Sequence, residues 1–379
     1  MSNRLIYVLN NYSKKSDEHY FHVINFLDKL ADTGVEIALI IEKSDELPVF
    51  RNPNIKIYPL SKGSKYLRGF KFLKALNKLY SEGYRKIFIR ISQNAIIPAI
   101  FYSFFSKLET YYWHSGTVLE YDRKHKPKLR LFIDEAKFWF IKTYTTWFVT
   151  GPESMKPYYI KHNVKADKII ILYNDIDISR FFISSDKEKN KEKLGIPEEE
   201  KVILFVHRLS PVRETLFYMP YIIEEFYKND NTEDYKFYII GGGSDKDKLE
   251  KEIEQKKLSE KVKILGSKPN AVIQDFYSVA DIFINPTMAE GFPRVIIEAM
   301  AVGLPVVTTD AGGIKDIMSA GQQEYIVDKK DRDAFAAKMV ELAQLKNKTD
   351  LGRENRNHVI RFSTENVALM YKNTIFNHE

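Results

Sequence analysis

The sequence predicts an α/β protein of two domains, each with a parallel β-sheet covered by helices. The chain has 379 residues, more than one ordinary hydrophobic core accommodates. Hydrophobic residues make up 44% and charged residues 29% of the chain, as in a globular protein. Short runs rich in β-branched and aromatic residues alternate with longer helical segments, which is the pattern of parallel strands joined by crossover helices.

The first half contains the first series of this alternation. Helices are expected over His19–Leu30 and Leu67–Tyr80. Between and around them lie five β-rich runs: Leu5–Leu9, Val35–Ile41, Ile55–Pro59, Lys86–Ile91 and Trp147–Thr150.

A second series begins near Lys201. Its β-rich runs are Val202–Val206, Lys236–Ile240, Val262–Leu265, Ile282–Asn285 and Val306–Thr308. The Lys-, Ser- and Glu-rich stretch Phe182–Glu200 is interpreted as the linker, and Phe362–Phe376 as a final amphipathic helix. We therefore expect domains at 1–182 and 183–361, followed by a C-terminal helix, 362–379, that could cross back to the first domain.

Positive charge is concentrated in the first half. Residues 1–180 carry 29 Lys and Arg against 18 Asp and Glu, whereas the remainder carries 29 against 33. Such asymmetry indicates an anionic partner for the first domain. No zinc-finger, RNA-recognition or basic-zipper signature is present, so nucleic acid is not expected. An anionic membrane surface or a phosphorylated acceptor fits this charge.

The stretch Lys124–Thr146 leaves two interpretations open. Basic residues before Leu131 precede Phe132, Phe138, Trp139 and Phe140. Such a helix can lie on anionic lipid, or it can pack its aromatic face on the sheet. The chain has no cysteine, no secretory signal pattern and no apolar run of about 18 residues. We expect a cytoplasmic protein that can associate peripherally with the cytoplasmic face of the membrane.

The densest motif runs from Asn285 to Val307, NPTMAEGFPRVIIEAMAVGLPVV. A strand ends at Asn285, and Pro293 suits the first position of a helix that continues through Glu298 and stops at Gly303. The backbone N–H groups of Arg294 and Val295 would then face a ligand, and such a helix start binds phosphate without a metal.

The motif resembles the signature of family 4 retaining glycosyltransferases, which have the GT-B fold: two Rossmann-like domains that face an interdomain cleft. Two glutamates lie seven residues apart within EGF-x4-EAMA-x-G-x-PVV. Four further stretches agree with that family in order and spacing. They begin at Ile171 (ILYNDIDISRF), Phe205 (FVHRLSPVR), Ile239 (IIGGG) and Asp310 (DAGGIKD).

The resemblance implies a role for each matching residue. Glu298 would bind both ribose hydroxyls of a nucleotide-diphosphate sugar, and Glu290 would orient the donor sugar. His114, on the first domain, would contact the sugar or its phosphate; Glu290 and His114 are thus the expected catalytic residues. The diphosphate would be bound by Arg208, Arg213, Pro293, Arg294 and Val295, and the supporting loops would be formed by Gly291, Phe292, Gly312 and Gly313.

The physical chemistry of glycosyl transfer agrees with these roles. Negative charge grows on the leaving diphosphate, and fixed cations and backbone dipoles stabilise it in the transition state. No metal and no other cofactor is predicted. Three Asp-x-Asp patterns, at Asp175, Asp245 and Asp331, are discounted because the first lies in the hinge and the others begin polar helices.

Some positions depart from the family pattern. Asn10-Asn-Tyr-Ser-Lys-Lys replaces the early Gly-Gly loop, Arg213 stands where lysine is usual, and His207 stands where glycine is common. Alternatives therefore stay open: a non-catalytic nucleotide-sugar-binding partner subunit, or another GT-B enzyme such as a nucleotide-sugar epimerase. The expected function is transfer of a sugar to a glycan or lipid-linked glycan acceptor in polysaccharide or glycoconjugate biosynthesis.

Overall fold

The computed structural model describes residues 3–12, 17–60, 64–114, 116–117, 123 and 125–377. The chain forms two compact units. The first holds the chain up to Asp175 and again from Thr364 onward, whereas the second holds Ile176–Ser363 together with Gly116 and Thr117. Within the described residues, no helix combines the length and the apolar character that crossing a bilayer requires.

The first unit is built on a seven-stranded parallel sheet with the order β3-β2-β1-β4-β5-β6-β7. The strands are β1 (Arg4–Leu9), β2 (Glu36–Ile41), β3 (Ile55–Pro59), β4 (Lys86–Arg90), β5 (Glu109–Trp113), β6 (Trp147–Thr150) and β7 (Ile169–Ile171). The helices are α1 (Asp17–Asp32), α2 (Lys65–Ser81), α3 (Gln93–Ser103), α5 (Lys128–Tyr144), α6 (Met155–Lys161) and α15 (Thr364–Phe376).

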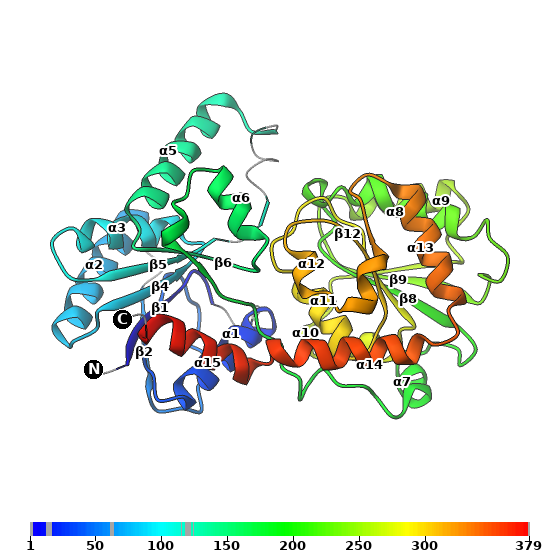
Figure 1. Cartoon of the computed structure of the whole chain (residues 1–379), viewed down its shortest axis with the longest axis horizontal. Helices are drawn as coiled ribbons and strands as arrows, with labels where there is room; N and C mark the ends of the chain where they lie inside the picture. The colour runs from blue at the N-terminus through cyan, green and yellow to red at the C-terminus, as the bar shows by residue number, and fades with distance from the viewer. Residues whose placement is uncertain are drawn as a thin grey trace. The chain divides into compact units, whose positions relative to one another are not determined.

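Helix α15 completes one face of this sheet beside α1 (Figure 1). Tyr371 of α15 packs edge-on against Phe26 of α1, with 4.7 Å between ring centroids. Lys29 and Glu365 form an ion pair across the two helices at 2.8 Å. Residues 364–376, far from α1 in sequence, therefore belong to the core of the first unit.

The second unit has a six-stranded parallel sheet with the order β10-β9-β8-β11-β12-β13. Its strands are β8 (Lys201–Val206), β9 (Tyr235–Ile240), β10 (Val262–Gly266), β11 (Ile282–Asn285), β12 (Val306–Thr309) and β13 (Ile326–Val327). Its helices are α7 (Lys187–Leu194), α8 (Thr215–Phe226), α9 (Lys246–Gln255), α10 (Asn270–Val279), α11 (Arg294–Ala301), α12 (Ile314–Ile317), α13 (Arg332–Gln344) and α14 (Lys348–Val359).

Both sheets share the order 3-2-1-4-5-6 of a doubly wound Rossmann-like domain, counted from the first strand of each unit. The α/β fold class with two such domains is therefore confirmed. In a sheet of this kind, ligands bind outside the carboxyl ends of the strands, where the strand order reverses. In the second unit this place lies beyond β8 and β11.

Two details differ from the sequence-based expectation. The structure divides the chain after Asp175, whereas the sequence predicts the boundary after 182. The intervening residues pack on the second unit: the Ile176 N–H donates to the Phe362 carbonyl at 2.8 Å, and the Arg356 guanidinium donates to the Ile178 carbonyl at 3.0 Å. The predicted linker also contains a helix, α7, which ends at Gly195 in the left-handed region (φ 66°).

Candidate nucleotide-sugar site

Glu290 lies in the loop after β11 and is buried, with 7% of its surface exposed. Its Oε1 lies 2.7 Å from Nε2 of His207 and 3.0 Å from Nη1 of Arg213. Burial alone would raise the pKa of Glu290, but the His207 hydrogen bond and the charge of Arg213 outweigh burial and lower it below the ordinary value. The side chain is therefore a buried carboxylate held ionised by its neighbours.

The partners of Glu290 come from the segment after β8. His207 directly follows β8, and its N–H donates to the Ile240 carbonyl at 3.0 Å. Arg213 ends a short 3-10 helix, Pro211–Arg213. Between them, Arg208 is exposed, and its guanidinium makes no hydrogen bond or ion pair with the part of the chain that the structure describes. One arginine is thus occupied by Glu290, and the other is available for a ligand.

Glycines after β9 allow the backbone there to lie close to the backbone of the segment after β8. A Cβ on Gly241 would lie 1.8 Å from the His207 carbonyl oxygen, and one on Gly243 would lie 1.9 Å from that of Leu209. The Leu209 N–H donates to the Gly242 carbonyl at 3.0 Å. The triple glycine therefore serves a close backbone approach, in keeping with its interpretation as a tight turn.

Helix α11 begins at Arg294, and Pro293 is its N-cap rather than its first helical residue. The difference of one residue arises because Pro293 has ψ 111°, which is extended. Arg294 and Val295 are half-buried, whereas Pro293 is buried. The helix ends as expected before Gly303, which has φ 75° and donates its N–H to the Met300 carbonyl at 3.0 Å.

Glu298 lies on α11, four residues after Arg294, and pairs with a tyrosine of α10. The Tyr277 hydroxyl donates to Glu298 Oε2 at 3.1 Å. Burial and the nearby carboxylate raise the pKa of Tyr277 well above its ordinary value, so the hydroxyl stays protonated and can donate. This contact fixes one carboxylate oxygen of Glu298.

The loop after β12 supports Glu290 through its backbone. Gly312 has φ 61°, and a Cβ at this position would lie 2.1 Å from the Glu290 carbonyl oxygen. Gly313 donates its N–H to the Gly291 carbonyl at 3.0 Å. Phe292, the residue after Gly291, is buried. Its ring packs edge-on against that of Phe362, with 5.2 Å between the ring centroids. The positive φ and the close approach to Glu290 explain in physical terms why a glycine occupies position 312.

The backbone of Glu290 has one further partner in the second unit. The Thr117 N–H donates to the Glu290 carbonyl at 3.2 Å. Thr117 is grouped with the second unit although His114, three residues earlier, belongs to the first.

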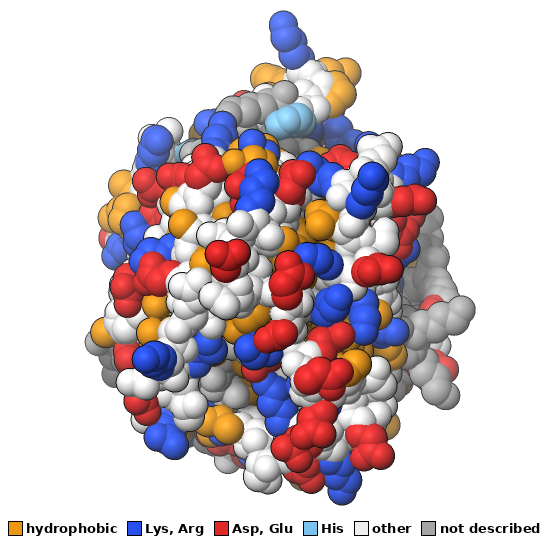
Figure 2. Space-filling model, turned by 90° about the vertical axis from the view of Figure 1, so that its right-hand side faces the viewer, with side chains coloured by type: hydrophobic (Ala, Val, Ile, Leu, Met, Phe, Trp, Pro, Cys, Tyr) orange, Lys and Arg blue, Asp and Glu red, His pale blue; other side chains and the backbone are white. Residues whose placement is uncertain are grey.

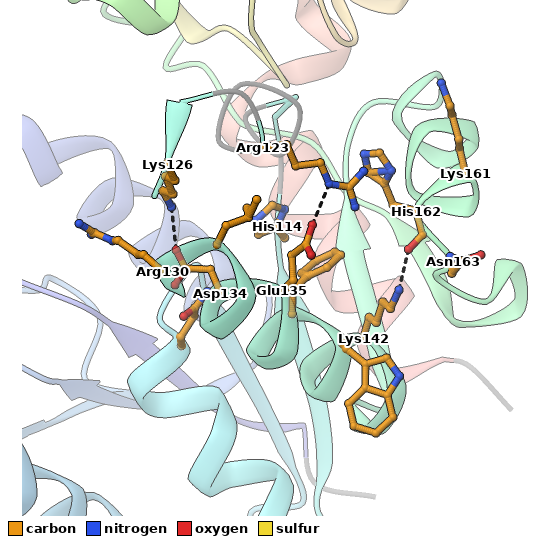
Figure 3. Close-up of a pocket in the computed structure, with 14 residues that line it drawn as sticks. His114, Arg123, Lys126, Arg130, Asp134, Glu135, Lys142, Lys161, His162 and Asn163 are labelled. Carbon is orange, nitrogen blue, oxygen red and sulfur yellow. Dashed lines mark hydrogen bonds and ion pairs between the residues drawn. The ribbon is translucent and has the colours of Figure 1, made fainter. Parts of the chain in front are cut away.

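His114 directly follows β5 of the first unit and lines a cavity of about 590 Å³ (Figure 3). Its Nδ1 lies 2.7 Å from the hydroxyl of Tyr159, which is fully buried. Burial raises the pKa of Tyr159 well above its ordinary value, so a protonated hydroxyl faces the imidazole. The rings of Phe138 and Phe148 pack at 5.7 Å and 6.1 Å from the imidazole centroid.

The structure thus brings Glu290 and Arg213 together, and the backbone of Gly312 lies against that of Glu290. Two contact residues were not among the predicted site residues. The first is His207, which carried no motif signal beyond its place beside Arg208, where glycine is common. The second is Tyr277, which lies 21 residues before Glu298 in the sequence. A lone histidine next to a predicted phosphate ligand is the one signal that could have identified His207 as a site residue.

In two of the three Asp-x-Asp patterns, local structure uses the carboxylate of the first aspartate. Asp175 accepts the Thr364 hydroxyl at 2.9 Å, and Asp331 caps α13 by accepting the Ala334 N–H at 2.9 Å. Asp245 is buried at the N-cap of α9. Among the residues that the structure describes, no group of three or more His, Asp or Glu side chains could hold a metal ion.

Comparison with known proteins identifies the domain that carries these residues. Residues 186–361 match the family model of glycosyl transferases group 1. The uncharacterized glycosyltransferase MJ1607 of Methanocaldococcus jannaschii is 31% identical over 177 residues, which are 46% of this chain and 44% of that protein. The putative teichuronic acid biosynthesis glycosyltransferase TuaC of Bacillus subtilis is 31% identical over 164 residues, 42% of this chain and 38% of that protein.

These matches span less than half the length of both curated relatives. A similar fold extends over the whole chain. The structure of Anabaena Alr3699/HepE in complex with UDP and glucose has a TM-score of 0.76 to this chain, at 18% identity and with 99% of each chain covered. Residues 186–361 therefore resemble the glycosyl transferases group 1 family, within a chain that has the two-domain GT-B fold.

Proposed function

We propose that the chain is a retaining, metal-independent glycosyltransferase. It would move one sugar from a nucleotide-diphosphate sugar to a glycan or lipid-linked glycan acceptor. The observation that carries the proposal is the group formed by Glu290, His207 and Arg213, next to the exposed Arg208. The family match of residues 186–361 supports it, as does the similarity to TuaC, a putative teichuronic acid biosynthesis glycosyltransferase.

In this proposal the second unit binds the donor. Arg208 and the first N–H groups of α11 bind the diphosphate, on which negative charge grows as the glycosidic bond breaks. Glu298 binds the ribose hydroxyls, and the hydrogen bond from Tyr277 positions its carboxylate. Glu290 accepts sugar hydroxyls, and His207 and Arg213 hold its carboxylate in place. His114 contacts the donor sugar or its phosphate.

Two variants separate nucleotide binding from turnover. Glu298→Ala should weaken binding of both nucleoside and nucleoside diphosphate, because the ribose contact is common to them. Glu290→Ala should mainly lower turnover. Each is measured with a panel of nucleotide sugars by calorimetry and by release of nucleoside diphosphate. Wild-type rates in both variants would show that the assigned residues do not form the donor site.

Product analysis distinguishes the alternatives. NMR of the glycosidic product should show the same anomeric configuration as the donor. A chain that binds nucleotide sugar but neither transfers nor hydrolyses it would be a partner subunit. A chain that changes the configuration of the sugar while it is still attached to the nucleotide would be an epimerase.

We further propose that the first unit docks on an anionic membrane. Large apolar side chains protrude from α5: Leu129, between the cations Lys128 and Arg130, is 74% exposed, and Phe132, two residues after Arg130, is 71% exposed. Phe105, after α3, is 92% exposed near Lys107. Apolar side chains flanked by Lys and Arg are typical of surfaces that bind anionic lipid. By contrast, the face drawn in Figure 2 intermixes acidic and basic side chains.

The membrane proposal has a direct test. Leu129→Ser combined with Phe132→Ser should abolish co-sedimentation with phosphatidylglycerol vesicles, and the wild type should not bind phosphatidylcholine vesicles. Val49→Ser is the matched control, since Val49 is 88% exposed in a loop outside α5. Equal vesicle binding by the wild type and the double variant would refute the docking surface.

A further inference from the structure

Another pocket of the first unit lies at the carboxyl ends of its parallel strands. It has a volume of about 220 Å³ and lies beside α2 and the start of α3, which pack against each other (Figure 1). Glu42 and Leu60 line the pocket and directly follow β2 and β3, and Asn94 lines it from the first turn of α3, after β4. In a doubly wound domain ligands bind at this edge of the sheet, so the place is that of a substrate pocket.

Glu42 is a buried carboxyl group with one oxygen held by the protein. Only 7% of its surface is exposed, and its N–H donates to the Leu9 carbonyl at 2.9 Å, at the end of β1. The Ser92 hydroxyl donates to Oε2 of Glu42. Oε1 has no hydrogen-bond partner in the part of the chain that the structure describes, and no described Lys or Arg forms an ion pair with the carboxyl group. The protein therefore leaves one oxygen of this group unused, in a side chain that lines a pocket.

Ser92 is placed by the helix that it caps. Its hydroxyl oxygen accepts the Ala95 N–H at 3.3 Å at the N-terminus of α3, and the side chain is buried. Because the oxygen is engaged by the cap, the single hydroxyl proton is donated to Glu42. The carboxyl group is therefore held in one orientation before a ligand arrives, which lowers the entropic cost of binding.

The surroundings of Glu42 favour an uncharged ligand that donates hydrogen bonds. Burial raises the pKa of Glu42, and this effect outweighs the Ser92 hydrogen bond and the charges of Arg68 and Lys43, which lower it. An anionic ligand would be repelled by the carboxylate, and an ammonium group by the two cations, both of which line the pocket. A hydroxyl group avoids both penalties, and its donation to Oε1 would favour the ionised form of Glu42.

Apolar side chains complete the lining. Leu60 and Phe72 are nearly fully buried and line the pocket together with the exposed amide of Asn94. A pocket with much apolar surface and a few fixed polar groups is typical of small-molecule sites. A sugar ring matches this lining, because hydroxyl groups surround its edge and C–H groups cover its two faces.

We propose that this pocket binds one sugar ring of the acceptor, with Glu42 Oε1 accepting a hydrogen bond from one of its hydroxyl groups. Glu42 is then a specificity-determining residue. An acceptor that lacks this hydroxyl would leave a buried oxygen unpaired, which is how polar sites reject deoxy analogues. The inference rests on the proposed transferase function and names the chemistry of its acceptor.

Saturation-transfer difference NMR on the full chain tests the pocket. The probes are the methyl glycosides of glucose, galactose, mannose and N-acetylglucosamine, and at least one of them should bind the wild type. Glu42→Ala should weaken this glycoside about 10- to 150-fold, since a hydrogen bond to a charged group accounts for about that factor. Glu42→Gln keeps the shape of the side chain but not its charge. It should weaken binding several-fold, and it keeps the test decisive if the alanine variant does not fold.

Deoxy analogues of the bound glycoside identify the hydroxyl group that Glu42 accepts. Removal of that hydroxyl should weaken binding to the wild type about as strongly as Glu42→Ala does. In Glu42→Gln the same removal should cost much less affinity, because both changes weaken the same hydrogen bond and their effects are not additive.

Two control variants localise the binding. Glu46→Gln changes a nearby exposed glutamate outside the pocket lining and should leave glycoside binding unchanged. Glu290→Gln should also leave it unchanged, because Glu290 belongs to the donor site. Absence of binding by every glycoside, wild-type affinity in both Glu42 variants, or loss of binding in Glu290→Gln would each overturn the inference.

The same measurements separate this inference from the proposed function. If a glycoside binds through Glu42 but no nucleotide sugar binds or reacts, the transferase function fails and the sugar pocket stands. If nucleotide sugars bind and react while the Glu42 variants retain full glycoside affinity, the sugar pocket fails and the transferase function stands.

Discussion

Replacing His207 with alanine is expected to destabilise the second unit at pH 7 and to make its stability less dependent on pH in the acid range. The imidazole Nε2 lies 2.7 Å from Glu290 Oε1, and both side chains are nearly buried, with exposures of 10% and 8%. A hydrogen bond to a charged group contributes about 1.5–3 kcal/mol. For a domain of about 150–250 residues, each kcal/mol corresponds to about 2–4 °C. The expected loss is therefore about 3–12 °C in melting temperature at pH 7.

The pH dependence follows from the lowered pKa of Glu290. Because its folded-state pKa lies below the ordinary value of 4.5, ionised Glu290 stabilises the native state above that pH. This contribution is lost as the pH falls through the lowered pKa. Without His207, one of the groups that lower the pKa of Glu290 is gone. The folded-state pKa of Glu290 then lies closer to its unfolded value, so less stability should be lost on acidification.

Thermal unfolding by calorimetry between pH 3 and pH 7 provides the assay. Glu290→Gln removes the titrating group and should abolish this part of the pH dependence. His207→Gln offers a neutral N–H donor and should recover part of the lost stability. If His207→Ala melts at the wild-type temperature at pH 7, the contact between His207 and Glu290 does not stabilise the protein, and the reasoning is refuted.

Two further predictions concern the residues that position the site. Tyr277→Phe removes the hydroxyl that donates to Glu298 and should weaken nucleotide binding several-fold without changing the sugar specificity, as calorimetry with a nucleotide-sugar panel can check. Gly312→Ala should lower turnover at least about 10-fold, because the residue has φ 61° and its Cβ would lie 2.1 Å from the Glu290 carbonyl oxygen. Lys251→Ala, at an exposed position of α9, should keep full turnover, and equal rates in the two variants would contradict the proposed support of Glu290.

Local patterns in the sequence were sufficient for the fold class and for the centre of the candidate site. Runs such as Ile282–Asn285 are fully buried strands, and their alternation with helices predicts parallel sheets. Glu290 and Glu298 lie on either side of the helix start that Pro293 marks, and Gly303 marks the end of that helix. These signals depend on neighbours within about ten residues, which is why they could be interpreted without coordinates.

Contacts between residues that are far apart in the sequence could not be predicted from local patterns. His207 and Glu290 are 83 residues apart, and no periodicity links them. Helix α7 was assigned to a linker because it is strongly polar, and its caps, Asp186 and Gly195, were a weaker signal than its composition. The interpretation of α5 as a core helix also holds only in part, since Ile141 is its one fully buried residue among those described.

The pocket beside Glu42 shows the same limit. Its lining joins the residues after β2 and β3 with α2 and the start of α3, so it depends on which segments the fold brings together. The sequence predicted an anionic partner for the first half from net charge alone. It could not show that Ser92 holds the carboxyl group of Glu42, 50 residues earlier, at the wall of a pocket.

The central claim is that a diphosphate is bound by Arg208 and the start of α11. The most direct measurement compares the affinities of UDP, GDP and ADP with those of the matching nucleosides, in wild type, in Arg208→Ala and in the exposed control Lys201→Ala. We predict that Arg208→Ala weakens the preferred nucleoside diphosphate about 10- to 150-fold and leaves the nucleoside unchanged, whereas Lys201→Ala changes neither. Equal loss for nucleoside and diphosphate, or no loss for either, would contradict the claim.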